Sequence, residues 1–132
     1  MGDVKQWIRY SSSDLEAAGE MLLRGLYRQS AIHSNQSAEK ILKACYFSSL
    51  DEYKEAMNTN THDLVLLVKE TRRNDNTFHN IMHPAYMLNT YYVPLKYPKE
   101  DEEQVDKKLA QELLNYAWDI YNFCTEWLET YY

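Results

Sequence analysis

The fold is decided by one stretch of the chain, His33-Ser34-Asn35-Gln36-Ser37-Ala38-Glu39-Lys40-Ile41-Leu42-Lys43-Ala44. Residues three and four apart form two stripes here, which predicts a helix over about residues 28–49. One stripe is mostly apolar and is expected to be buried: Ala31, Asn35, Ala38, Leu42, Cys45 and Tyr46. The other stripe is mostly polar: His33, Gln36, Lys40, Lys43 and Phe47.

The same spacing predicts the helices on either side. A first helix is expected over about residues 3–25, stopped by Gly25, with this buried stripe: Trp7, Ile8, Ser11, Leu15, Ala18, Leu22 and Leu26. Residues 50–60 are mostly polar and are predicted to be a loop. Thr61 is expected to cap the next helix, which carries Leu64, Leu67 and Val68 and ends at the cluster Asn74-Asp75-Asn76.

Prolines shape the second half of the chain. Pro84 is predicted to begin or interrupt a short fourth helix, whereas Pro94 and Pro98 predict a non-helical connector over residues 93–98. The acidic run Glu100–Glu103 is expected to open the last helix, because negative charge suits a helix N-terminus. The core face of that helix is expected to hold Val105, Leu109, Leu113, Tyr116, Ile120, Phe123 and Trp127. Since no long segment alternates with period two, residues 1–132 are predicted to form a single all-α domain, an up-and-down bundle of about five helices.

A second informative segment is Tyr91-Tyr92-Val93-Pro94-Leu95-Lys96-Tyr97-Pro98. Together the two segments resemble the HEPN family (higher eukaryotes and prokaryotes nucleotide-binding domain). Its members carry a helix similar to Q-Q-A-A-E-K-A-L-K-A and a later segment similar to Y-x-x-x-R-Y-P, in which Lys96 takes the arginine place. Further resemblances are found, in the family's order, at these positions: Trp7, Asp14-Leu15-x-x-Ala18, Gly25-Leu26-Tyr27 and Thr61-His62-Asp63-Leu64-x-x-Leu67.

Composition narrows the classes of function. The net charge of −6 predicts no non-specific binding to nucleic acid, because that attraction grows with the number of neutralised phosphates. No apolar run approaches the length of a membrane span and no leader is evident, so we expect no membrane segment. Cys45 and Cys124 stand apart in helical stripes, which favours buried thiols in a reducing, cytoplasmic setting.

Two groups of residues are candidates for holding a nucleotide. Gln36, Lys40 and Lys43, with His33 one turn earlier, line one side of the second helix and could converge on a phosphate and a base edge. Lys96 lies between Tyr92 and Tyr97, where the rings could stack on a base and the ammonium could meet a phosphate. The alternatives are a solvated helix face with a local Glu39–Lys43 pair, and a purely structural strap.

Enzymatic and metal-binding alternatives find less support. HEPN ribonucleases use an R-x4-6-H motif at the opening of the last helix, but here the pattern occurs only as Arg28-x4-His33 and as Arg73-x5-His79, equally Arg72-x6-His79. The chain is therefore predicted to be more a binding module than an enzyme. His79 and His83 lack a third metal ligand, and no cofactor motif is present, so neither a metal nor a cofactor is expected.

The last helix carries a second stripe, composed of Leu114, Trp118, Tyr121, Thr125, Leu128 and Tyr132. It fits either a helix wedged among several neighbours or a homodimer surface. The family resemblance implies a stand-alone prokaryotic domain that is encoded beside a small nucleotidyltransferase in a toxin–antitoxin-like pair. Three hypotheses follow: a module that binds this partner, a nucleotide or both; a metal-independent ribonuclease; and a dimerising bundle without ligand.

Overall fold

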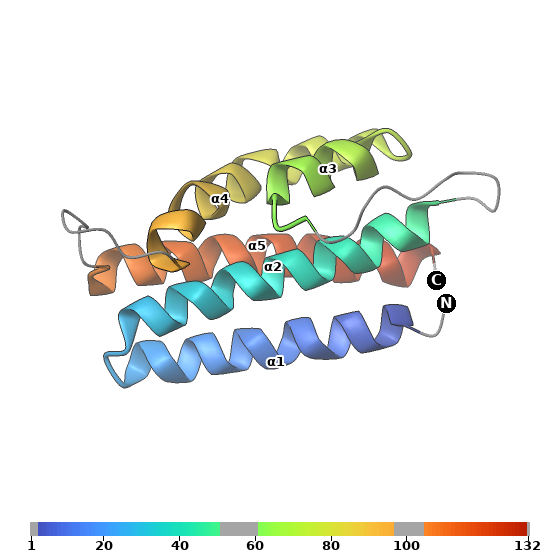
Figure 1. Cartoon of the computed structure of the whole chain (residues 1–132). Helices are drawn as coiled ribbons and strands as arrows, with labels where there is room; N and C mark the ends of the chain where they lie inside the picture. The colour runs from blue at the N-terminus through green and yellow to red at the C-terminus, as the bar shows by residue number, and fades with distance from the viewer. Residues whose placement is uncertain (1–2, 51–60, 97–104, 132) are drawn as a thin grey trace.

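The computed structural model describes residues 3–50, 61–96 and 105–131. These ranges form α1 (Asp3–Leu23), α2 (Tyr27–Ser49), α3 (Leu64–Arg72), the 3-10 helix η1 (Asn76–Ile81), α4 (Met82–Lys96) and α5 (Lys107–Tyr131), and none of them contains a strand. The long helices α1, α2 and α5 pack along one another (Figure 1). Helices α3 and α4 lie on the side of α2 that is opposite α1 (Figure 1). The predicted all-α helical bundle is confirmed.

Helix α2 is the centre of the bundle and packs against α1, α3, α4 and α5. Small side chains let α1 approach it closely. The Ser30 hydroxyl donates to the Ala18 carbonyl at 2.8 Å, and Ser11 and Ser37 each donate to the other's carbonyl, at 2.8 and 2.9 Å. Because a buried hydroxyl that loses its partner costs free energy, these bonds favour one register between the two helices. The predicted buried stripe of α2 is buried throughout.

Helix α1 ends at Leu23, two residues earlier than predicted, and Gly25 forms the turn that follows it. Its φ of 77° lies in the left-handed region, where only glycine is free of a Cβ penalty. The Leu26 amide donates to the Met21 carbonyl at 2.8 Å and the Gly25 amide to the Leu22 carbonyl at 3.1 Å. These two bonds satisfy carbonyls at the helix end and turn the chain directly into α2.

The expected starts of α3 and α5 were wrong by a few residues. Asp63, not Thr61, caps α3, because its side chain accepts from the Leu66 amide at 3.1 Å; the Thr61 hydroxyl accepts from the Asp63 amide one step earlier. In α5 the Asp106 side chain accepts from the Leu109 amide at 2.8 Å. The short aspartate side chain reaches the third helical amide and sets each start. The run 100–103 lies outside the described residues.

The predicted non-helical connector over residues 93–98 was wrong in its first part, because α4 continues through Pro94 to Lys96. Pro94 removes only the hydrogen bond to the Thr90 carbonyl. Thr90 is exposed, so water can reach that carbonyl, and the helix ends two residues later. Pro84 lies in the first turn of α4, where a missing amide proton costs little. Pro98 lies outside the described residues.

An aromatic cluster joins η1 to α5. The Phe78 ring is fully buried and meets the rings of Phe123 and Trp127 edge-on, with centroids 5.1 Å away in both cases. The Trp127 indole donates to Asp75 at 2.8 Å. A hydrogen bond from the Thr77 hydroxyl, helped by this indole, holds the pKa of Asp75 below its ordinary value.

Both stripes of α5 contribute to the core. Leu113 and Ile120 of the first stripe are buried, and so are Leu114 and Leu128 of the second, whereas Trp118 stays 42% exposed. Helix α5 therefore packs among α1, α2 and α4. The homodimer stays a prediction, and burial of Leu114 and Leu128 leaves less of the second stripe exposed for it. Tyr132 lies outside the described residues.

The two cysteines are buried, and burial raises the pKa of the Cys45 thiol, with the neighbouring Cys124 adding to the effect. A raised pKa keeps this thiol protonated and unreactive. Across the described ranges, no helix is long and apolar enough to cross a membrane.

Candidate ligand-binding flank of α2

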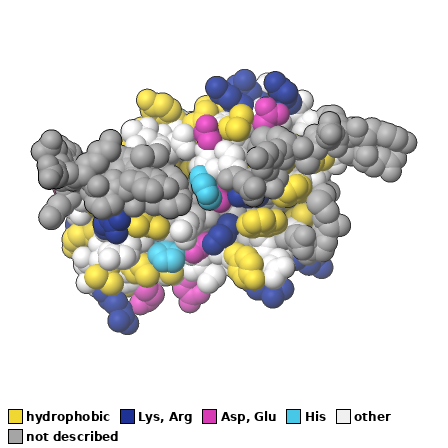
Figure 2. All heavy atoms as spheres, in the orientation of Figure 1, with side chains coloured by type: hydrophobic (Ala, Val, Ile, Leu, Met, Phe, Trp, Pro, Cys, Tyr) yellow, Lys and Arg dark blue, Asp and Glu magenta, His cyan; other side chains and the backbone are white. Residues whose placement is uncertain are grey.

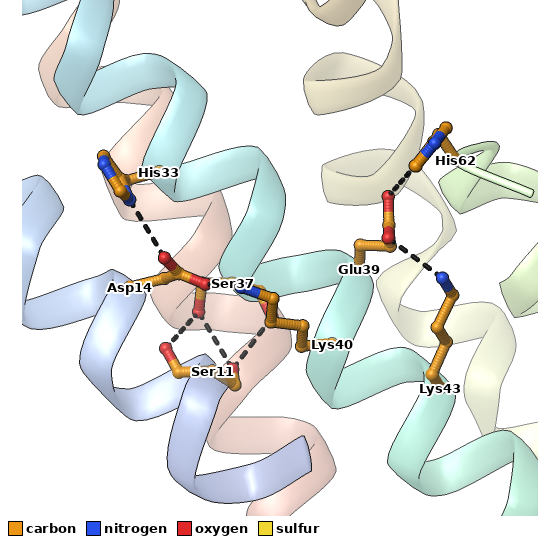
Figure 3. A network of polar contacts seen from close by, with 8 residues as sticks. All are labelled: Ser11, Asp14, His33, Ser37, Glu39, Lys40, Lys43 and His62. Carbon is orange, nitrogen blue, oxygen red and sulfur yellow. Dashed lines mark hydrogen bonds and ion pairs between the residues drawn. The ribbon is translucent and has the colours of Figure 1, made fainter. Parts of the chain in front are cut away.

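The candidate site lies where α1, α2 and the segment leading into α3 meet. Two buried carboxylates, Asp14 on α1 and Glu39 on α2, organise it, and each bridges one lysine and one histidine (Figure 3). We refer to Asp14, His33 and Lys40 as the Asp14 cluster, and to Glu39, Lys43 and His62 as the Glu39 cluster.

The Asp14 cluster ties α1 to α2. Asp14 is only 8% exposed. One of its oxygens lies 2.9 Å from His33 Nδ1, and the other accepts a hydrogen bond from Lys40 Nζ. Because a carboxylate only accepts, Nδ1 must be the donor, which leaves Nε2 on the far side of the imidazole ring. Lys40 Nζ also lies 6.0 Å from the centre of the Tyr10 ring, at the range of a cation–π contact.

The Glu39 cluster repeats this arrangement and ties α2 to the start of α3. Lys43 Nζ donates to Glu39 Oε2 at 3.0 Å, and His62 Nδ1 lies 2.8 Å from Glu39 Oε1. Lys43 is only 5% exposed, and its Nζ lies 5.5 Å from the centre of the Trp7 ring. Each ammonium is thus held between a carboxylate and an aromatic face.

The two clusters share one face of the molecule. In the space-filling view, cationic, acidic and histidine side chains are grouped near the middle of this face, over α1 and α2 (Figure 2). The structure therefore brings the candidates His33, Lys40 and Lys43 to one flank, and Gln36 lies half-buried on the same helix. It also shows the Glu39–Lys43 pair that the sequence offered as the alternative reading.

Sequence reasoning missed Asp14, the partner of His33 and Lys40, and it missed the contact of His62 with Glu39. The sequence did hold a signal for Asp14. This residue lies three positions after Ser11 and four before Ala18, on the buried stripe of the first helix, so burial of its carboxylate could be expected. The side chains of Tyr92 and Lys96, and the whole of Tyr97, lie outside the described residues. The second half of the candidate site therefore stays a prediction.

The ribonuclease-like patterns do not lie at the opening of the last helix, α5. Arg28 and His33 lie on α2, Arg73 caps the end of α3, and His79 lies on η1. Arg73 pairs with Glu70 at 3.5 Å, and His79 Nδ1 lies 3.0 Å from the Asn76 carbonyl. His83 meets the Tyr116 ring edge-on. In the part of the chain that the structure describes, no three histidine, cysteine or acidic residues could hold a metal ion.

Comparison with known proteins decides the family. The sequence matches the HEPN domain over residues 4–127. This chain belongs to the HEPN family. The HEPN fold is also seen in TT1696 from Thermus thermophilus, which is 22% identical with a TM-score of 0.79 over 96% of this chain and 98% of that one.

A second structural relative is ST0689, described as an archaeal HEPN homologue. It is 23% identical, with a TM-score of 0.70 over 93% of this chain and 95% of that chain. Identities this low show a common fold only. No curated protein matches this HEPN chain.

Proposed function

We propose that this HEPN domain is a binding module that holds the phosphates of a nucleotide on the flank formed by the Asp14 and Glu39 clusters. The observation that supports the proposal is the pair Lys40 and Lys43, which lie one turn apart on α2 with each ammonium held in place by a carboxylate and a ring. An acidic domain needs such a local concentration of cations to attract a phosphate.

Lys40 keeps the capacity to bind while it is paired, because its side chain is 27% exposed, whereas the buried Lys43 adds positive charge from within the flank. An ammonium carries three N–H donors, and the carboxylate takes one of them. A lysine that is already ordered loses little rotamer freedom when a ligand arrives, which favours affinity. Tyr10 beside Lys40 is 48% exposed, so its ring offers a surface on which a base can stack. Tyr92, Lys96 and Tyr97 are proposed to complete the site from the other segment.

The same module is proposed to dock on a small nucleotidyltransferase, in the manner of a toxin–antitoxin-like pair. HEPN family membership supports this partner class, and a nucleotide site suits a protein that acts beside a nucleotide-using enzyme. A cytoplasmic location agrees with two buried thiols that form no disulfide. A homodimer through the exposed ring of Trp118 completes the proposal.

Titration with fluorescently labelled ATP tests the nucleotide site. Lys40→Ala and Lys96→Ala should each weaken binding about ten-fold or more, because each removes a charge-assisted hydrogen bond. Lys69→Ala is the matched control, since Lys69 is exposed on α3, away from both clusters. Thermal melting of each variant separates lost binding from lost folding.

Three results would count against the proposal in different ways. Equal affinity in wild type, Lys40→Ala and Lys96→Ala would exclude this flank. A similar loss in Lys69→Ala would show that general charge, not the site, holds the nucleotide. No binding in any protein would leave docking on a nucleotidyltransferase as the better account, to be tested by co-purification with that partner.

A further inference from the structure

The two clusters balance their charges when both histidines are neutral. Two carboxylates, Asp14 and Glu39, face two lysines, Lys40 and Lys43. The formal charge of the flank is therefore zero, and each histidine that takes up a proton adds one positive charge. The whole chain carries −6. A site for an anion in this domain thus needs a further source of positive charge.

We propose that phosphate binding at this flank is linked to protonation of His33, and that Asp14 competes with the phosphate for Lys40. This inference rests on the proposed nucleotide site and deepens it, since it says when the site binds. The ligand class is a nucleotide that presents phosphate oxygens to His33 and Lys40 together.

The geometry of His33 determines where the proton must go. Its Nδ1 already donates to Asp14 at 2.9 Å, so an added proton binds Nε2. The side chain is 29% exposed, so a ligand can approach the ring. A neutral ring presents the Nε2 lone pair to a phosphate oxygen and repels it. A protonated ring presents an N–H donor and a positive charge to the phosphate. One protonation therefore replaces the repulsion by a hydrogen bond and adds a charge attraction.

The charged groups around His33 come from both packed helices. Asp14 lies on α1, and its second carboxylate oxygen contacts Lys40 on α2. The Glu39 cluster follows along the same flank. Asp14 contacts both His33 and Lys40, so it places a negative charge beside any anion bound to Lys40. Its removal should therefore strengthen anion binding under conditions where His33 is neutral.

Calorimetric titration with ATP at about pH 6 and about pH 8 tests the proton linkage. The ionic strength is held constant and two buffers of different ionisation enthalpy are used, so that proton uptake is counted directly. Wild type is compared with His33→Gln, which keeps a polar side chain but cannot take up the proton. His79→Gln is the matched control, because His79 lies on η1, which packs against α3, α4 and α5 and not against α1 or α2.

Wild type should bind ATP more tightly at the lower pH by about ten-fold beyond any change seen in His33→Gln, which is the effect of one charge-assisted hydrogen bond. Because ATP itself takes up protons in this range, the difference between the two proteins isolates His33. The extra proton uptake should disappear in His33→Gln and persist in His79→Gln. Asp14→Asn should bind several-fold more tightly than wild type at the higher pH, roughly the effect of removing one nearby like charge.

Identical pH dependence and proton uptake in wild type and His33→Gln would overturn the linkage while leaving the nucleotide site intact. Weaker binding by an Asp14→Asn protein that melts like wild type would also overturn it. If wild type binds no ATP even at the lower pH, the proposed function itself fails, and the linkage fails with it.

Discussion

Replacing Lys43 by methionine should destabilise the fold because it removes one buried ammonium, whose main partner is Glu39. Methionine keeps an unbranched stem beside Trp7, so the change removes mainly the ammonium that donates to Glu39 at 3.0 Å. Breaking a buried ion pair costs about 3–5 kcal/mol when the remaining charge has no other partner. Here Glu39 keeps its contact with His62. We therefore expect a cost nearer that of one charge-assisted hydrogen bond, about 1.5–3 kcal/mol.

Urea unfolding followed by circular dichroism at neutral pH measures this cost. For a domain of this size, a loss of 1 kcal/mol lowers the melting temperature by roughly 3–5 °C, so Lys43→Met should melt roughly 5–15 °C below wild type. Lys69→Met is the control for the substitution itself and should stay within about 0.5 kcal/mol of wild type, because Lys69 is exposed.

The double variant Glu39→Gln/Lys43→Met provides a stricter test of the reasoning. It leaves no uncompensated carboxylate, so it should be more stable than the sum of the two single variants predicts. Lys43→Met with the stability of wild type would refute the argument. Lys43 would then contribute nothing to the fold despite its burial, and its position would be explained by a ligand alone.

The remaining predictions concern acid stability, chemistry and assembly. Since the folded-state pKa of Asp75 is lowered, first by the Thr77 hydroxyl and then by the Trp127 indole, its stabilisation is present above the unfolded-state value of about 3.9 and is lost as pH falls through the lower folded-state value. Asp75→Asn should therefore lose part of the steep fall in stability that wild type shows below about pH 4, as measured by urea unfolding across that range; an unchanged pH profile would contradict this. The purified chain should not cleave single-stranded RNA, and cleavage that disappears in His33→Ala or His79→Ala would show that the binding-module interpretation is wrong. Light scattering should give about twice the chain mass of 15.7 kDa, and Trp118→Glu should give the monomer; a wild-type monomer at high concentration would remove the homodimer.

The elements that sequence alone predicted are those encoded over a few neighbouring residues. The extent of α2 followed from its two stripes, and the predicted range of about 28–49 agrees with Tyr27–Ser49. Gly25 marked the end of α1 because a left-handed turn needs a residue without Cβ. The Glu39–Lys43 pair could also be anticipated, since residues four apart meet on any helix. The HEPN resemblance rests on the same local patterns.

The sequence predictions for the end of α4 and the cap of α3 were wrong because the tertiary structure overrode a local rule. Proline predicted a break at residue 94, but a helix about to end loses only one hydrogen bond there, and exposure of Thr90 decides whether that loss is tolerated. Thr61 was the expected cap of α3, but the backbone path brings the side chain of Asp63 to the third helical amide instead. In both cases a local rule applied, and the geometry of the folded chain decided whether it held.

The sequence by itself thus determined the family, the extent of α2 and its buried face, whereas the tertiary structure decided the electrostatics of the candidate site. Asp14 meets Lys40 across 26 residues and His33 across 19, and His62 meets Glu39 across 23. No periodic pattern encodes such contacts, because they depend on the register of α1 against α2 and on where the chain enters α3. The reciprocal Ser11–Ser37 bonds favour that register. Shifting α1 by one turn, about 5.4 Å, would carry Asp14 away from both cations.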